Sequence, residues 1–150
     1  MNKIVNIIVD ASGSMAEDDK NAVIKYLLNG ISNISETVDF HNIDFVLYQW
    51  GKISKKIDSL EKAKLKFLGN SSTSGLEELK QMVDKNQPLI FISDGNFDIR
   101  DKENIKKLSE NIVTIFIGVD ANRKILQDIS TDQIVYSVID FMQAICEVCK

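Results

Sequence analysis

The chain has 150 residues, of which 44% are hydrophobic and 27% are charged, and this composition is typical of a globular protein that forms one domain over residues 1–150. Its net charge of −4, without a basic tail or stripe, argues against a nucleic-acid partner. No apolar stretch approaches the roughly 20 residues that span a bilayer, and the first apolar run is too short for a signal peptide. These features predict a soluble, cytoplasmic protein without a membrane partner.

Short β-rich runs alternate with longer helical segments along the chain. This pattern is typical of a mostly parallel sheet with helices on both faces. Strands are predicted at Lys3–Val9, Ile43–Trp50, Ile53–Ile57, Leu89–Ser93, Ile112–Val119 and Gln133–Val138. Helices are predicted at about Met15–Ser35, Leu76–Lys85, Asp101–Glu110, Asn122–Ile129 and Ile139–Cys149.

Gly51-Lys52 between two predicted strands favours a hairpin turn, so the second of these strands is expected to be an antiparallel edge strand. Ser59–Lys66 fits either a short helix or an extended segment. The fold class predicted from these elements is α/β. It consists of three layers around a doubly wound, mostly parallel, Rossmann-like sheet.

The stretch Asp10-Ala11-Ser12-Gly13-Ser14 directly follows the first predicted strand. Open α/β sheets bind their ligands at the carboxyl ends of strands. Alternate residues of an extended chain project to the same side, so Asp10, Ser12 and Ser14 can turn three oxygen-bearing side chains toward one point. One carboxylate and two hydroxyls suit a hard cation such as Mg²⁺, and they do not suit zinc, which favours His and Cys.

Two further loops carry oxygen ligands that can join this group. Asp94 ends the predicted strand Leu89–Ser93, as Asp10 ends the first one, and adjacent parallel strands bring such residues to one sheet edge. A polar loop around Thr73 precedes a predicted helix. If this loop lies at the same edge, the predicted metal ligands are Asp10, Ser12, Ser14, Thr73 and Asp94.

These residues resemble the motifs of the von Willebrand factor A (vWA) domain family and its metal-ion-dependent adhesion site (MIDAS). Asp10-Ala11-Ser12-Gly13-Ser14 matches the family's Asp-x-Ser-x-Ser motif, Thr73 resembles its threonine, and Asp94-Gly95 resembles its Asp-Gly. The motifs occur in the family's order over nearly the whole chain. One departure is Ser71-Ser72, where the family usually has Gly-Gly before the threonine, so Ser72 and Ser74 are alternatives to Thr73.

The resemblance implies a compact intracellular vWA domain of the bacterial type. By resemblance, Asp10, Ser12 and Ser14 would hold Mg²⁺, or Mn²⁺ or Ca²⁺ in its place, and Thr73 and Asp94 would contribute directly or through water. A partner protein would complete the coordination with an Asp or Glu side chain. The family also suggests as partner a MoxR-type AAA+ ATPase or another component of a stress or conflict system.

The residue types themselves favour binding over catalysis. Three of the five predicted ligands are neutral hydroxyls, so much of the charge of the cation is left to attract an outside anion. The alternative is a Mg²⁺-dependent phosphatase or phosphotransferase of the haloacid-dehalogenase type with Asp10 as nucleophile. Such enzymes carry a second Asp two residues later, where this chain has Ser12, and no lysine loop is evident apart from Lys106 or Lys107.

Several other residues have simpler interpretations. Ser14-x-x-Glu17 and Ser74-x-x-Glu77 are capping boxes for the helices that follow, and the second box would leave Thr73 free. Cys146 and Cys149 lie on one face of the last predicted helix and, without a second Cys or His pair, are interpreted as packing residues rather than as half of a zinc site. His41 is predicted on the surface, Trp50 in the core, and Phe97 as an exposed contact for a partner.

Overall fold

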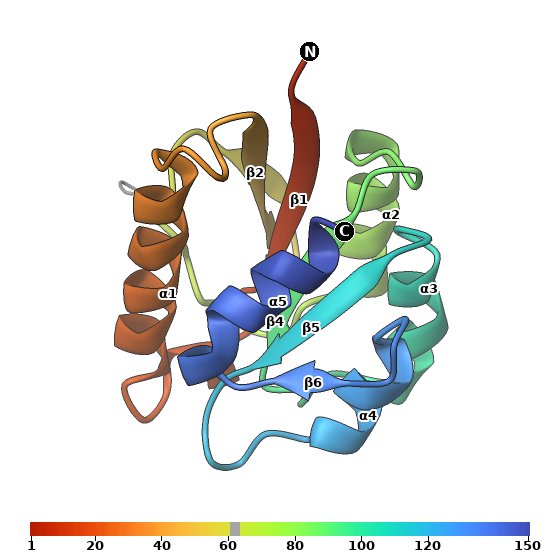
Figure 1. Ribbon diagram of the computed structural model, residues 1–150. Helices are drawn as coiled ribbons and strands as arrows, with labels where there is room; N and C mark the ends of the chain where they lie inside the picture. Colours follow the sequence, from red (N-terminus) through yellow and green to blue (C-terminus); the bar gives the residue numbers. More distant parts are fainter. Residues whose placement is uncertain (61–63) are drawn as a thin grey trace.

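A six-stranded sheet with helices on both faces forms the centre of the computed structural model, which describes residues 1–60 and 64–150 (Figure 1). The strand order is β3-β2-β1-β4-β5-β6, and all neighbouring strands are parallel except β2 and β3. The predicted fold class is therefore confirmed, including the antiparallel edge strand. The strands are β1 (Lys3–Asp10), β2 (Ile43–Trp50), β3 (Lys55–Ile57), β4 (Leu89–Ser93), β5 (Ile112–Phe116) and β6 (Val135–Tyr136).

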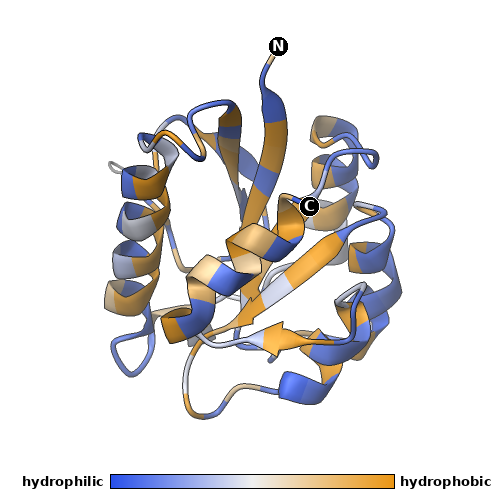
Figure 2. Cartoon of the chain, viewed as in Figure 1, coloured by the Kyte–Doolittle hydropathy of each residue, from blue (hydrophilic) through white to orange (hydrophobic). Residues whose placement is uncertain are grey.

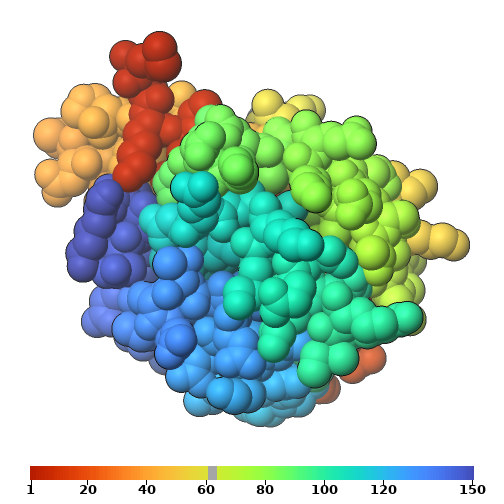
Figure 3. Space-filling view, turned by 90° about the vertical axis from the view of Figure 1, so that its right-hand side faces the viewer, coloured from red at the N-terminus to blue at the C-terminus, as the bar shows by residue number. Residues whose placement is uncertain are grey.

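The helices divide between the two faces of the sheet. α1 (Lys20–Ser35) and α5 (Phe141–Val148) cover one face. α2 (Thr73–Met82), α3 (Lys102–Lys106) and α4 (Arg123–Ile129) cover the other face, where Figure 3 shows them side by side in green, teal and blue. None of these helices is both long enough and apolar enough to cross a lipid bilayer.

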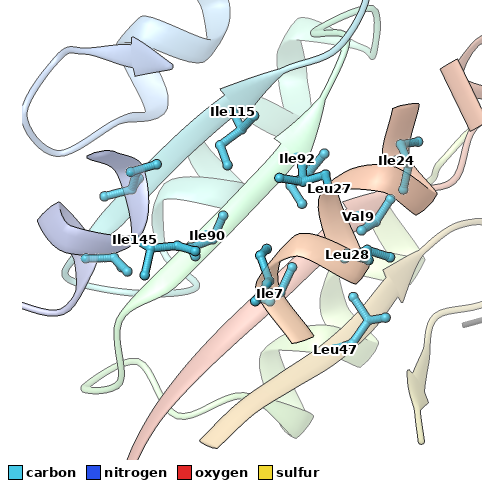
Figure 4. Close-up of a cluster of buried hydrophobic side chains, with 14 of the residues drawn as sticks. Ile7, Val9, Ile24, Leu27, Leu28, Leu47, Ile90, Ile92, Ile115 and Ile145 are labelled. Atoms are coloured by element: carbon cyan, nitrogen blue, oxygen red, sulfur yellow. The ribbon is translucent and has the colours of Figure 1, made fainter. Parts of the chain in front are cut away.

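Each face of the sheet has its own hydrophobic core, because the central strands are apolar on both sides (Figure 2). Side chains alternate along β1, so Ile7 and Val9 face α1 whereas Ile8 faces α2. Figure 4 shows Ile7 and Val9 beside Leu28 of α1. Each fully buried side chain of this size stabilises the fold by about 1.5–3 kcal/mol relative to exposure.

The first helix begins later than predicted. Residues Gly13–Ala16 form a 3₁₀ turn, and α1 begins only at Lys20 instead of Met15. Between them, Asp18 and Asp19 adopt left-handed conformations with φ of 50° and 62°, which interrupt a right-handed helix. The predicted capping box at Ser14 is therefore wrong.

The second helix begins earlier than predicted, at Thr73 instead of Leu76. Its N-cap is Ser72, whose Oγ accepts a hydrogen bond from the backbone N–H of Gly75 at 3.1 Å. The capping box predicted at Ser74 is therefore wrong as well, and Thr73 is the first helical residue.

The remaining differences are at element ends. A 3₁₀ turn at Ile99–Asp101 precedes α3, which ends at Lys106, and α5 is three residues shorter than predicted. β3, β5 and β6 are also shorter than predicted. Part of the ambiguous segment Ser59–Lys66 lies outside the described residues.

The connections change sides of the sheet between β1 and β4. The chain passes from β1 through α1 to β2 over one face, and from β3 through α2 to β4 over the other face. β1 and β4 are parallel neighbours, with Val9 opposite Ile92, so Asp10 and Ser93 follow at the same edge. This is a topological switch point, the position at which open α/β sheets bind ligands.

Candidate metal centre

Asp10, at the end of β1, is a fully buried carboxylate of the candidate site. Its Oδ1 accepts hydrogen bonds from the backbone N–H of Ser12 at 3.0 Å and from Ser71 Oγ at 2.8 Å, and its Oδ2 accepts one from Ser93 Oγ at 2.7 Å. Burial raises the pKa of the Asp10 carboxyl, because the charged form loses its hydration, and these hydrogen bonds offset only part of that rise. The three donors fix the carboxylate at the end of β1.

Ser12 and Ser14 follow Asp10 in the chain, and their hydroxyls lie side by side. The 3₁₀ turn at Gly13–Ala16 brings the two Oγ atoms to 3.1 Å from one another. Neighbouring ligands of an octahedral Mg²⁺ ion, at metal–oxygen distances of about 2.1 Å, are about 3.0 Å apart. The spacing and chemistry of this hydroxyl pair therefore fit two adjacent ligands of a small divalent cation.

Thr73 approaches the same place from the start of α2. Thr73 is an exposed residue, and its hydroxyl donates to Oδ1 of buried Asp101 at 2.6 Å. Thr73 and Ser12 both line a cavity of about 360 Å³, together with Asn96, Phe97 and Asp101. Trp50 holds the start of α2 in place, because its Nε1 donates to the carbonyl oxygen of Ser72 at 2.9 Å.

The alternatives to Thr73 are less suited to a metal. Ser72 Oγ caps α2, and Ser74 Oγ lies 3.0 Å from it. Ser71, at the position where the family usually has glycine, donates to Asp10 instead. Ser71 and Thr73 both line the cavity without capping the helix, and of these two only Thr73 leaves the Asp10 carboxylate free of its hydroxyl.

Asp94 turns toward a lysine rather than toward the hydroxyls. Its Oδ2 is 3.2 Å from Lys20 Nζ, and its Oδ1 accepts a hydrogen bond from the backbone N–H of Asn96 at 2.9 Å. Lys20 Nζ also lies 2.8 Å from Asp120 Oδ1. Asp94 is fully buried and only 1% of the Lys20 side chain is exposed, so a permanent positive charge lies inside the protein beside this edge of the sheet.

The surroundings of Lys20 keep it charged. Burial by itself lowers the pKa of a lysine, but hydrogen bonds to Asp120 and Asp94 outweigh burial here and raise the pKa of Lys20. The hydrogen bond from Lys20 lowers the pKa of Asp120. Gly118, with φ of 89°, leaves room for the lysine, since a Cβ atom there would lie 2.5 Å from Lys20 Cε.

Asp10, Ser12, Ser14 and Thr73 are linked at the switch point, and Asp94, which follows β4 there, is paired with Lys20. Asp10 contacts the Ser12 backbone, Ser12 contacts Ser14, and Thr73 shares a cavity with Ser12. No cluster of three or more His, Cys, Asp or Glu residues suited to a metal occurs in the described ranges.

The other predicted residues have mixed outcomes. Trp50 is fully buried, as predicted, but Phe97 is half-buried and packs edge-on against it with ring centroids 5.3 Å apart, so its predicted exposure is wrong. His41 is exposed, as predicted. Cys146 and Cys149 are free thiols on α5 and the residue after it, and burial raises the pKa of Cys149.

Sequence reasoning missed the residues that hold the predicted ligands in place: Lys20, Ser71, Ser93, Asp101 and Asp120. The sequence could have indicated Ser93, because this residue ends β4 beside the end of β1. It could not have indicated Lys20, because an isolated lysine near a helix start is normally solvated.

Taken together, the fold and the position of the candidate site are those of a doubly wound α/β protein that binds its ligand at the switch point. No family model and no curated protein sequence matches the chain. Among solved structures, it resembles proximal thread matrix protein 1 from the mussel byssus with a zinc-occupied MIDAS motif. The TM-score is 0.68 and the identity is 15%, over 98% of this chain and 44% of that chain.

Two further solved structures resemble the chain. One is the manganese-loaded TRAP protein of Plasmodium vivax, with a TM-score of 0.69 and 17% identity over 96% of this chain and 72% of that chain. The other is the ArnB paralog VWA2 of Sulfolobus acidocaldarius, with a TM-score of 0.62 and 16% identity over 98% of this chain and 44% of that chain. The chain therefore has a vWA-type fold. It spans less than half the length of the mussel and Sulfolobus proteins.

Proposed function

We propose that the protein is a Mg²⁺-dependent, non-catalytic module that binds a protein partner. The observation that carries this proposal is the pair of hydroxyls of Ser12 and Ser14, 3.1 Å apart at the switch point, beside a cavity that Thr73 shares. The zinc-occupied MIDAS motif of the mussel protein and the manganese-loaded Plasmodium protein support a divalent cation on a vWA-type fold.

In the proposed site, Ser12, Ser14 and Thr73 would hold the ion directly. Asp10, whose oxygens accept hydrogen bonds within the protein, and Asp94 would contribute through water. Asp10 also orients the Ser12 backbone through their hydrogen bond. When bound, the ion supplies an electrophilic point that attracts a carboxylate. Because the hydroxyl ligands are neutral and Asp94 is already balanced by Lys20, little negative charge of the protein competes with an Asp or Glu of the partner.

The geometry does not favour the alternative of phosphoryl transfer. A nucleophilic carboxylate needs an accessible oxygen, but Asp10 is fully buried and both of its oxygens already accept hydrogen bonds. The non-catalytic proposal rests on this burial. A cytoplasmic location, a bacterial source and a partner such as a MoxR-type AAA+ ATPase belong to the same proposal, and they rest on the resemblance of the motifs.

Removing both hydroxyls is expected to weaken Mg²⁺ binding strongly. In a Ser12→Ala and Ser14→Ala double variant, two adjacent ligands are lost, so the Mg²⁺ affinity should fall by at least about tenfold to a hundredfold. Isothermal titration with MgCl₂ measures the affinity, and circular dichroism shows whether the fold is retained. The matched control is Ser35→Ala, which removes a hydroxyl at the far end of α1 and should leave the affinity unchanged. Equal affinities in all three proteins would contradict the proposed site.

A further inference from the structure

A second hollow lies next to the candidate metal centre, beside the turn between β2 and β3. It has a volume of about 460 Å³ and is lined by that turn and by residues 66–69. Two branched apolar side chains line it although they are largely exposed, Ile53 at 73% and Leu68 at 69%. We call this hollow the hairpin groove. It offers apolar surface that the protein itself does not cover.

The hairpin groove is also strongly basic. Exposed Lys52, Lys55 and Lys66 line it. Residues 51–70 carry six lysines and two acidic residues, whereas the rest of the chain carries twelve basic and twenty acidic residues. Lysines are therefore concentrated in this stretch of an otherwise acidic sequence, and the three that line the groove favour a ligand of negative charge there.

The hairpin groove is joined to the metal-binding loop by backbone hydrogen bonds. The N–H of Gly13 donates to the carbonyl of Gly69 at 2.7 Å, and the N–H of Leu68 donates to the carbonyl of Ala11 at 3.1 Å. The wall of the groove is thus hydrogen-bonded to the loop that carries Ser12 and Ser14. Because these loops are directly hydrogen-bonded, one extended peptide, which advances about 3.3 Å per residue, can contact both sites.

We propose that the hairpin groove docks an acidic peptide segment with a branched aliphatic residue, from the partner protein whose carboxylate completes the metal site. The aliphatic side chain would lie on Ile53 and Leu68, and the acidic residues would pair with the lysines around them. This inference rests on the proposed function and specifies the class of partner. Charge complementarity and the physical continuity of the two sites carry it.

The test is a selection from a displayed library of random peptides of roughly twelve residues, carried out on the whole protein in Mg²⁺. The enriched peptides are expected to combine acidic residues with Leu, Ile or Val. Fluorescence polarisation of the synthesised peptides then gives their affinities. A Lys52→Glu and Lys66→Glu double variant and a Leu68→Asp variant should each bind at least about tenfold more weakly. Matched controls are Lys25→Glu and Tyr26→Asp, exposed residues of α1 whose replacement should leave the affinities unchanged.

The outcomes separate this inference from the proposed function. No enrichment, enriched peptides without an acidic excess, or equal binding by the groove variants would overturn the inference, and the Mg²⁺ titration would still test the metal centre. Peptide binding that depends on Lys52, Lys66 and Leu68 supports the inference. If that binding persists in chelator and in the Ser12→Ala and Ser14→Ala variant, the groove is supported and the metal-dependent function is contradicted.

Discussion

Replacing Lys20 by methionine is expected to destabilise the protein by about 3–5 kcal/mol in the absence of divalent ions. Methionine keeps most of the length of the side chain but removes the charge, and it leaves Asp94 buried without its ionic partner. The Asp120 side chain is 48% exposed, so it loses less when the lysine is removed. Urea denaturation in chelator measures the change. The control is Lys25→Met, an exposed position on the same helix, where a change within about 0.5 kcal/mol is expected.

The same variant is expected to gain more stability from Mg²⁺ than the wild type does. In the wild type, Lys20 already balances Asp94, whereas in the variant a bound cation at the same edge supplies the missing positive charge. A ligand that binds only the folded state stabilises it by mass action, so the denaturation midpoint should rise more steeply with Mg²⁺ concentration. Equal stability of Lys20→Met and Lys25→Met in chelator would show that the buried ion pair does not stabilise the folded protein.

Replacing Trp50 by alanine is expected to cost about 3–5 kcal/mol. Its fully buried ring packs against Phe91, with centroids 6.0 Å apart, and against Phe97. The variant also loses the hydrogen bond from Nε1 to the carbonyl of Ser72, which then keeps only the N–H of Leu76 as donor. Thermal and urea denaturation measure the loss.

Trp50→Phe separates packing from hydrogen bonding, because it retains an aromatic ring but removes Nε1. Its expected cost is about 1–2 kcal/mol, from the smaller ring and from the lost hydrogen bond to the carbonyl of Ser72 at the start of α2, which still accepts the N–H of Leu76. Since this carbonyl precedes Thr73, the phenylalanine variant should also bind Mg²⁺ more weakly. Equal stabilities of the alanine and phenylalanine variants would show that ring packing contributes little.

The strands were the most predictable part of the fold. Ile43–Trp50 and Leu89–Ser93 were predicted to the residue, because runs of apolar side chains between polar segments mark buried strands. The start of α1 was not predictable in this way. Asp18 and Asp19 favour a helix N-terminus by charge, yet here they adopt left-handed conformations, and their local sequence does not distinguish the two cases.

The start of α2 was missed for a related reason. Ser72 and Ser74 are both good N-cap residues, and only packing decides between them. In the structure, Gly75 lies against the carbonyl of Gly51, where a Cβ atom would come within 2.2 Å of the oxygen, and Trp50 holds Ser72. These contacts set the first turn of α2 and make Thr73 its first residue.

In the candidate site, too, local contacts could be predicted from the sequence, whereas distant contacts could not. Asp10, Ser12 and Ser14 could be predicted because they follow one strand, and their spacing alone brings them together. The pairing of Asp94 with Lys20 joins residues 74 positions apart, and the bond from Thr73 to Asp101 joins residues 28 positions apart. Such partners depend on how the loops pack, and residue types and spacing do not encode them.

The most direct measurement of the central claim is nuclear magnetic resonance of the backbone amides during titration with Mn²⁺, whose unpaired electrons broaden nearby signals. We predict selective broadening of residues 10–14, 71–75 and 93–96, which Mg²⁺ should reverse by competition. The Ser12→Ala and Ser14→Ala variant should lose this pattern. Broadening that is confined to acidic residues elsewhere, or that is unchanged in the variant, would contradict a metal centre at the switch point between β1 and β4.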